Sequence, residues 1–327
     1  QALAQLMQRC DAITTEFENV PAEALYTLGG QRQVAPDGPA VAICQDRAKE
    51  KATFARAGVL CAPHAVIATE ADVAAADDAL LPGILKTARL GYDGKGQRSV
   101  ADRGDLAAAF AELGGVVCVL EQRLSLQLEL SVIVACGSDG TVVHLPVQQN
   151  LHRDGILAVT EAPAPDVSPE LAQAAVDQAR ALALSLRYVG VLCVEFFVTT
   201  DGRLLANEMA PRPHNSGHYS IDGCDCSQFE LQVRALAGLP LVTPWAHSAS
   251  VMLNLLGDLW PGLGTPRLRQ PPWAEVLALP GAHLHLYGKL SPRAGRKMGH
   301  LTLTAPNAAA ARVLAGQACR LLGLAPI

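Results

Sequence analysis

Two glutamates, Glu195 and Glu208, are the residues of this chain whose spacing most directly implies chemistry. Each lies in an apolar, strand-like run, and the Asp201-Gly202 pair between the runs is a strong signal for a β-hairpin. If these two residues form the whole turn, counting outward along both strands places Glu195 directly opposite Glu208. Directly opposed side chains share one face of a sheet, with Cβ atoms roughly 4.5–5.5 Å apart. The sequence therefore predicts a pair of facing carboxylates.

Facing carboxylates repel each other unless a cation lies between them. The other residues of the segment Leu192–Val198 are apolar, which predicts a strand buried on both faces. Oxygen ligands suit Mg²⁺, which proteins usually bind through one or two carboxylates together with substrate phosphates. We therefore predict that Glu195 and Glu208 bind Mg²⁺ or Mn²⁺. The alternative is an edge hairpin with both glutamates in solvent.

A glycine-rich loop, Gly91–Gln97, lies between two further strand-like segments. Glycine lets the backbone approach a ligand closely, and successive N–H groups can bind phosphate oxygens. Lys86, in the strand before the loop, would add a positive charge. No Gly-Lys-Ser/Thr follows and the loop opens no helix, which excludes a Walker or Rossmann phosphate loop. An ordinary hairpin loop is the other interpretation.

Basic residues crowd a loop near the C-terminus: Lys289, Arg293, Arg296, Lys297 and His300. This loop is either a solvated turn or a second anion site, because clustered Lys and Arg recognise phosphate well. The sequence leaves both interpretations open.

The polar segment Pro211–His218 directly follows the strand of Glu208. A rigid polar segment beside a metal site favours a substrate loop. The sequence does not separate a catalytic role of His214 or His218 from a supporting hydrogen bond.

The elements that must position these residues alternate between helix and strand. The chain has 327 residues, of which 50% are hydrophobic, and a single core rarely grows beyond roughly 250–300 residues, so we expect two or three domains. A strand at Cys10–Thr15 and a helix after Pro21 lack a preceding strand, and we expect them to be the tail of an α/β domain whose beginning is absent. Further strands are predicted at His64–Ala68, Gly83–Ala88, Val116–Glu121, Glu129–Ala135, Val142–Gln148, Val189–Val198, Arg203–Met209, Ser250–Leu256, His283–Lys289 and His300–Thr304. Helices are predicted at Gln45–Gly58, Asp102–Leu113, Pro169–Arg187, Ser227–Ala237 and Asn307–Leu322.

Composition argues against several functional classes. The net charge is -5 and Lys and Arg form no blocks, so we expect no nucleic-acid or anionic-membrane partner. No apolar run has the roughly 18–20 residues that span a bilayer, and the first residues do not resemble a signal peptide. The nine cysteines lack zinc-ligand spacing, so we expect reduced, mostly buried thiols and a cytoplasmic protein.

Seven segments together resemble 5-(carboxyamino)imidazole ribonucleotide synthases, which are ATP-grasp ligases. They occur in family order across essentially the whole chain, and the pair NEMAPRPHNSGH and GRKMGH is highly specific. The segments are TEFENVP from Thr15, QDRAKEK from Gln45, GYDGKGQ from Gly91, NLHRDGIL from Asn150, YVGVLCVEFF from Tyr188, NEMAPRPHNSGH from Asn207 and GRKMGH from Gly295.

The resemblance implies an α/β (α+β) fold of the ATP-grasp type in four parts. Residues 1–45 would be the remnant of an N-terminal α/β domain, and 46–120 the small ATP-grasp subdomain with its lid. Residues 121–245 would be the large subdomain, and 246–327 a small C-terminal domain. A homodimer is also implied.

The implied reaction belongs to purine synthesis. ATP would phosphorylate bicarbonate to carboxyphosphate, and the exocyclic amine of 5-aminoimidazole ribonucleotide would then be carboxylated. One alternative is a formate-dependent glycinamide ribonucleotide transformylase, whose substrate loop differs from HNSGH. Another is a nucleotide-binding module without catalysis, which would be expected to have lost Glu195, Glu208 or Arg212.

The resemblance also implies roles for individual residues. Expected ATP contacts are Arg47, Lys86, Gly91, Tyr92, Asp93, Gly94, Lys95, Gly96, Gln97, Glu121, Gln122, Arg123, Leu124, Glu129, His152, Asn207 and Glu208. Expected catalytic residues near bicarbonate are Arg212, His214 and Asn215. Expected contacts to the ribonucleotide are Glu16, Tyr92, Asp93, Lys289, Arg296 and Lys297, the last three at its phosphate. The implied metal ligands, Glu195 and Glu208, agree with the hairpin argument.

The chain departs from the family pattern at three points. The Gly-rich strand-loop-helix that normally opens the family is absent, which leaves the packing around Glu16 open. Ala294 replaces a usual proline in the basic loop. Ala210 stands where many ATP-grasp enzymes have a metal-binding asparagine, so only two carboxylates are expected at the metal.

Overall fold

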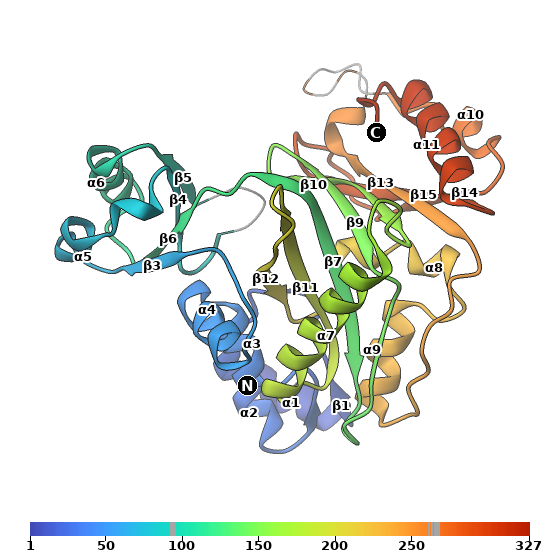
Figure 1. The fold of residues 1–327 in the computed structure, drawn as a ribbon. Helices are drawn as coiled ribbons and strands as arrows, with labels where there is room; N and C mark the ends of the chain where they lie inside the picture. The colour runs from blue at the N-terminus through green and yellow to red at the C-terminus, as the bar shows by residue number, and fades with distance from the viewer. Residues whose placement is uncertain (92–95, 261, 263, 265–268) are drawn as a thin grey trace.

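The computed structural model describes the whole chain except residues 92–95, 261, 263 and 265–268 (Figure 1). Figure 1 shows a small lobe built on one sheet, standing beside a larger body built on another. The small-lobe sheet has the strand order β3-β6-β4-β5, and the large sheet has the order β12-β11-β7-β9-β10-β13-β15-β14, with β8 also paired to β7.

The N-terminal unit packs beneath the large sheet. Its two short parallel strands are β1 (Ala12–Ile13) and β2 (Gln33–Val34). Its helices are α1 (Ala2–Arg9), α2 (Ala22–Gly29) and α3 (Gly38–Cys44). Asp37 caps α3 by accepting a hydrogen bond from Ala40 N, with a proline in the first turn. Helix α4 (Arg47–Arg56) follows at once, so the predicted helix Gln45–Gly58 begins two residues later than expected.

The small lobe is a four-stranded antiparallel sheet with helices on it. Leu85 and Leu120 of its strands are fully buried against Leu106 and Phe110 of α6. Thr69 and Asp102 cap α5 and α6 with their side chains. The elements are β3 (His64–Ile67), α5 (Glu70–Ala75), η1 (Asp78–Leu80), β4 (Gly83–Thr87), β5 (Gln97–Val100), α6 (Arg103–Glu112) and β6 (Cys118–Gln122).

The large sheet is covered on both faces in its centre. Leu192 and Val194 pack toward α7, whereas Val191 and Cys193 pack toward α9. This alternation confirms the prediction of a strand buried on both faces. The elements are β7 (Leu126–Cys136), β8 (Val142–His144), β9 (Gln148–Arg153), β10 (Ile156–Ala162), α7 (Pro169–Ser185), β11 (Gly190–Thr199), β12 (Leu204–Ala210), η2 (Asn215–Gly217), α8 (Ser220–Gly223) and α9 (Gln228–Ala237).

The C-terminal elements continue the same sheet rather than forming one of their own. Strand β13 (Ala249–Leu256) pairs with β10 through Val159↔Leu253 and three neighbouring pairs. Helix α11 (Ala308–Leu322) covers these strands and gives them a separate hydrophobic core. The remaining elements are η3 (Gly257–Leu259), α10 (Trp273–Leu277), β14 (Ala282–Leu286) and β15 (Lys297–Ala305).

The hairpin β9–β10 was not predicted, although the sequence carries a signal for it. Asp154 and Gly155 form a two-residue turn, with φ of 52° and 76°, between the paired residues Arg153 and Ile156. Asp-Gly favours this turn because both residues tolerate positive φ. The dipeptide lies inside the segment NLHRDGIL.

The two-residue turn predicted between Glu195 and Glu208 is wrong. Thr199 N–H donates to Arg203 O at 3.0 Å, so the loop contains the three residues 200–202. Gly202 has a φ of 81°, the left-handed conformation that closes three-residue hairpin loops. The loop therefore shifts the strand register by one residue.

A β-bulge between the turn and the two carboxylates shifts the register back by one residue. Phe196 pairs with Ala206, whereas Glu195 pairs with Glu208, so Asn207 is the extra residue of the bulge. The predicted pairing of Glu195 with Glu208 is confirmed, but it results from two offsets that cancel.

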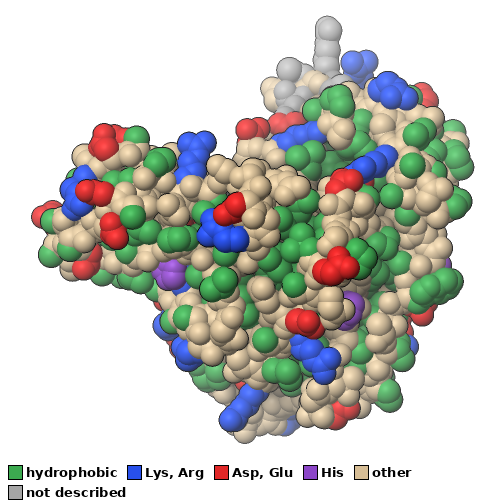
Figure 2. All heavy atoms as spheres, viewed as in Figure 1, with side chains coloured by type: hydrophobic (Ala, Val, Ile, Leu, Met, Phe, Trp, Pro, Cys, Tyr) green, Lys and Arg blue, Asp and Glu red, His purple; other side chains and the backbone are tan. Residues whose placement is uncertain are grey.

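The charge pattern agrees with the composition. Figure 2 shows Lys and Arg interspersed with Asp and Glu on the face in view. No helix in the described part of the chain is long and apolar enough to cross a membrane. All nine cysteines are free thiols, and only Cys10 and Cys61 are not fully buried.

Gly202→Ala is expected to lower the free energy of unfolding by about 1–2 kcal/mol, because a residue with a Cβ is strained in the left-handed region. No atom lies within 4 Å of the added Cβ, so the loss reflects backbone strain rather than a clash. Chemical unfolding followed by tryptophan fluorescence measures it. Gly202→Asn should lose less, and equal losses for the two variants would contradict the strain argument.

Candidate active site

Glu195 and Glu208 line one cavity of about 600 Å³. Residues from three distant parts of the chain line it. Besides the two glutamates of the hairpin, these are Glu16 and Glu18 of the N-terminal unit and Lys289 near the C-terminus. The geometric condition for a shared ligand, two facing carboxylates at one cavity, is therefore met. The remaining lining residues are Gly91, His152, Gly155, Leu157, Arg212, Pro213, His214, Asn215, His218, Phe229, Tyr287 and Lys297.

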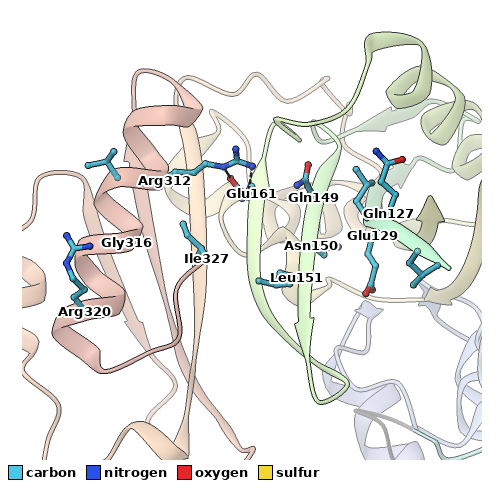
Figure 3. A pocket seen from close by; sticks show the side chains of 13 residues that line it. Gln127, Glu129, Gln149, Asn150, Leu151, Glu161, Arg312, Gly316, Arg320 and Ile327 are labelled. Carbon is cyan, nitrogen blue, oxygen red and sulfur yellow. Dashed lines mark hydrogen bonds and ion pairs between the residues drawn. The ribbon is translucent and has the colours of Figure 1, made fainter. Parts of the chain in front are cut away.

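A second cavity, of about 750 Å³, lies between α11 and strands β7, β9 and β10 (Figure 3). In Figure 3 Arg312 reaches across to Glu161, and its Nε donates a hydrogen bond to Glu161 Oε2 at 2.5 Å. Neither Glu195 nor Glu208 lines this cavity. The chemistry-bearing side chains thus gather in the smaller cavity.

Glu208 is paired with Arg47, the first residue of α4, at 2.8 Å. Burial would raise the pKa of Glu208, but the charge and hydrogen bond of Arg47 lower it to about 2. The pKa of Arg47 is raised in turn, because the attraction of Glu208 outweighs the effect of burial. Glu208 is therefore ionised at neutral pH.

Glu195 contacts the polar loop that follows its partner strand. His214 Nε2 lies 3.1 Å from Glu195 Oε1, and His214 Nδ1 lies 2.9 Å from Ser216 Oγ. Asn215 exchanges hydrogen bonds with Asn254 of β13, which fixes the loop to the C-terminal strands. The loop is thus held at both the carboxylate and the sheet.

The donor set fits a hard divalent cation. Glu195 and Glu208 offer only oxygen ligands. Asn207, the bulge residue next to Glu208, adds a buried Oδ1 for which the described residues provide no hydrogen-bond partner. Mg²⁺ prefers such oxygen ligands and completes its shell with water and phosphate. Metal binding by the two glutamates stays a prediction.

A buried cluster of charges lies where the two ATP-grasp subdomains are expected to meet. Glu121, 3% exposed, is 2.6 Å from Lys86 Nζ and 3.0 Å from Lys51 Nζ. Burial would raise the pKa of Glu121, but Lys86 and Lys51 lower it to about 2. Lys51 was not predicted, although it occurs in the segment QDRAKEK.

Arg212 forms a salt bridge with Glu18, in which Nη2 lies 2.7 Å from Oε2. Glu16, the glutamate predicted to face the substrate, also lines the cavity, on the same loop as Glu18. The segment TEFENVP contains both acids, of which only Glu16 was predicted to face the substrate. Glu18 is the one that contacts a predicted catalytic residue.

Glu129 and His152, both predicted near the nucleotide, are 2.7 Å apart across β7 and β9. Burial would lower the pKa of His152, but the hydrogen bond and charge of Glu129 raise it. The imidazole is therefore more readily protonated than a free one. Gln122 is the last residue of β6, and Arg123 and Leu124 lie in the connection from β6 to β7.

The structure divides the predicted basic cluster. Lys289 and Lys297 line the cavity, whereas Arg296 does not and donates to Ser291 O at 2.8 Å. Lys289 Nζ lies 5.5 Å from the ring centre of Tyr287, a cation–π contact. Burial and the neighbouring Arg296 lower the pKa of Lys289.

A group of metal-ligand types, Asp222, His285 and His300, lies beside the cavity with ligand atoms within 4.8 Å of one another. The rings of His285 and His300 stack at 4.5 Å with an angle of 14° between their planes. The lone pair of an imidazole lies in its ring plane, so nearly parallel rings cannot both point at one ion. His300 instead bonds to Tyr287 OH at 2.8 Å and supports the cavity wall.

The glycine-rich loop is described only at its ends. Gly91 lines the cavity, Gly96 has a φ of 71°, and Gln97 pairs with Lys86 as the first residue of β5. The predicted contacts Tyr92, Asp93, Gly94 and Lys95 lie outside the described residues.

Comparisons with known proteins agree with this architecture. The chain matches the ATP-grasp domain over residues 52–229, the phosphoribosylaminoimidazole carboxylase C-terminal domain over 250–313 and the ribonucleotide synthetase preATP-grasp domain over 1–45. It is 44% identical over 309 residues to an N5-carboxyaminoimidazole ribonucleotide synthase of Brucella melitensis, covering 94% of this chain and 82% of the relative.

Two solved structures are similar throughout. That of the N5-carboxyaminoimidazole ribonucleotide synthetase from Thermus thermophilus has a TM-score of 0.88 at 38% identity, covering 100% of this chain and 86% of the other. That of the Aspergillus clavatus N5-carboxyaminoimidazole synthase, in complex with ADP and 5-aminoimidazole ribonucleotide, has a TM-score of 0.88 at 30% identity, covering 98% and 84%.

Glu208→Gln is expected to lower ADP formation by about 100-fold or more while leaving the fold intact, because the amide cannot carry the charge that a cation and the transferring phosphoryl group require. A coupled ADP assay and circular dichroism measure the two effects. Glu230→Gln, at an exposed position of α9, is the matched control. Turnover within about threefold of the parent would remove Glu208 from the catalytic set.

Proposed function

The chain belongs to the N5-carboxyaminoimidazole ribonucleotide synthase family of ATP-grasp ligases, and we propose that it carboxylates 5-aminoimidazole ribonucleotide with ATP and bicarbonate. The observation that carries the proposal is the pair of facing carboxylates, Glu195 and Glu208, at a cavity that cationic side chains also line. The solved relative from Aspergillus clavatus binds ADP and 5-aminoimidazole ribonucleotide.

The proposed nucleotide site lies where the small lobe faces the large sheet. Lys86 would contact the phosphates, the connection after Glu121 would hold the adenine, and Glu129 would bind the ribose. Mg²⁺ held by Glu195 and Glu208 would neutralise charge on the phosphates. Because Arg47 already pairs with Glu208, its guanidinium lies next to the place where that charge would develop.

The proposed carboxylation begins with bicarbonate held by Arg212. A bicarbonate oxygen attacks the γ-phosphorus of ATP, the bond to the β-phosphate oxygen breaks, and ADP leaves with carboxyphosphate formed. The ribonucleotide amine then forms a bond to the carboxyl carbon, loses a proton, and phosphate leaves. Carboxyphosphate hydrolyses readily, so water must be excluded from the cavity, which Gly91 at the start of the glycine-rich loop helps to line.

Charges of both signs line the cavity. Glu16 and Glu18 come from the N-terminal unit, whereas Lys289 and Lys297 come from the C-terminal elements. The phosphate of the ribonucleotide would lie at the two lysines and its amine near Arg212. The resemblance also implies a homodimer, which light scattering of the purified protein measures.

The purified chain is expected to form ADP only when ATP, Mg²⁺, bicarbonate and 5-aminoimidazole ribonucleotide are all present. Coupled ADP assays with each amine, and with formate in place of bicarbonate, test this. Turnover with formate and glycinamide ribonucleotide would instead identify a transformylase. ADP release that does not depend on any amine would overturn the assignment.

Lys297→Ala is expected to raise the KM for the ribonucleotide by about 10- to 100-fold, because a charge-assisted contact to phosphate contributes roughly 1.5–3 kcal/mol. The KM for ATP should change by less than about threefold. Steady-state kinetics separate the two. Arg293→Ala, an exposed cation of the same loop that does not line the cavity, is the control. Equal effects on both substrates would argue against a phosphate site at Lys297.

A further inference from the structure

Helix α4 lies against the open edge of β12, the strand that carries Glu208. Strand β12 is the outermost strand of the nine-stranded sheet, so its outward backbone groups have no neighbouring strand. Ala206 N–H donates to Leu60 O at 2.8 Å, after α4 has ended. Ala206 thereby forms an isolated parallel bridge with Cys61, whereas at Asn207 and Met209 side chains of α4 bind the edge.

Two consecutive residues of α4 bind the backbone on either side of Glu208. Glu50 Oε1 accepts a hydrogen bond from Met209 N at 2.5 Å. Lys51 Nζ donates to Asn207 O at 2.8 Å. The two side chains therefore hold the peptide groups that flank the glutamate, in place of a further strand.

The contact with Asn207 falls on the bulge. A bulge leaves its extra residue outside the strand ladder, and Asn207 is that residue. Its carbonyl oxygen accepts the hydrogen bond from Lys51 Nζ. Since a one-residue slip turns every side chain to the other face, the bulge decides whether Glu208 faces Glu195.

Lys51 also connects this strand to the small lobe. Its ammonium lies 3.0 Å from Glu121, and Glu121 in turn lies 2.6 Å from Lys86. One cation thus contacts both the bulge of β12 and the carboxylate that holds Lys86. Both ends of the proposed nucleotide site depend on its position.

A contribution to the stability of the fold does not by itself explain why the ionisable side chains of Glu50 and Lys51 are buried. Glu50 is 2% exposed and Lys51 is 1% exposed. Burial raises the pKa of Glu50 to about 8, although Lys51 and Arg47 act in the opposite direction. A buried ion pair such as Lys51–Glu121 is often no more stabilising than apolar residues of similar volume, and burying the carboxyl of Glu50 is costly, so a role in the site accounts better for both residues.

We propose that Glu50 and Lys51 are positioning residues that fix Glu208, and through Glu121 also Lys86, for a nucleotide bound with a divalent cation. This inference rests on the proposed function and adds two residues to its site. Neither side chain lines the 600 Å³ cavity, so both act through the residues they hold.

The first test replaces Lys51 with Met, which keeps the length of the side chain and removes its donor. Mn²⁺ binding in the presence of ADP, followed by electron paramagnetic resonance, should weaken by about 10-fold or more, as for other residues that support metal ligands. The kcat should fall by about 10- to 100-fold. Lys49→Met, the same change on the exposed side of α4, should leave both within about twofold.

The second test compares two replacements of Glu50. Glu50→Gln keeps an oxygen that accepts from Met209 N–H, and should hold Mn²⁺ within about threefold of the parent. Glu50→Met removes the acceptor and should weaken Mn²⁺ binding by about 10-fold. A positional role predicts this difference, whereas a purely electrostatic role predicts equal losses for both variants.

Three results would overturn the proposal: Mn²⁺ binding and kcat unchanged in Lys51→Met, equal losses in the two Glu50 variants, or unfolding of both Lys51→Met and Glu50→Met in circular dichroism. The last would assign the residues to stability alone. The parent protein separates this outcome from failure of the proposed function, since an active parent with unaffected variants contradicts only the positioning role.

Discussion

The structure depends on one constraint, the need to keep two carboxylates facing each other on neighbouring strands. At roughly 5 Å and an effective dielectric constant of about 20, two such charges repel by about 3 kcal/mol. Each carboxylate is bonded to a different segment: Glu208 to Arg47 at the start of α4, and Glu195 to His214 in the loop after β12. These partners draw distant parts of the chain toward the hairpin.

The same convergence explains why the cavity needs the whole chain. Glu16 and Glu18 come from the N-terminal unit and the two lysines from the C-terminal elements, while the facing pair lies on β11 and β12 at one edge of the large sheet. Because β10 pairs with β13, the C-terminal strands are held in register with the central ones by backbone hydrogen bonds. A continuous sheet thus fixes the distance between the cations and the paired carboxylates more firmly than a flexible linker would.

The sequence predicted the elements that periodicity and turn chemistry specify, and it missed contacts that only folding creates. Strand burial around Glu195 followed from its apolar neighbours, and the predicted helices Asp102–Leu113, Pro169–Arg187, Ser227–Ala237 and Asn307–Leu322 each overlap an observed helix. Lys51 gave no such signal, because a lysine in a charged helix is ordinarily exposed, and its contacts with the edge of β12 and with Glu121 explain its burial. Likewise, the choice between Glu16 and Glu18 depends on where Arg212 lies in space.

The hairpin shows why a correct pairing followed from a wrong turn. The loop at Asp201 has three residues rather than two, which alone would have moved Glu208 out of line with Glu195. Both faces of β11 are buried, however, so a slipped register would place apolar side chains and carboxylates in the wrong layers. The burial of side chains along the strands therefore sets the register, and the bulge at Asn207 compensates for the extra residue in the turn. Local turn chemistry indicates that a hairpin forms, whereas the core determines which residues face each other.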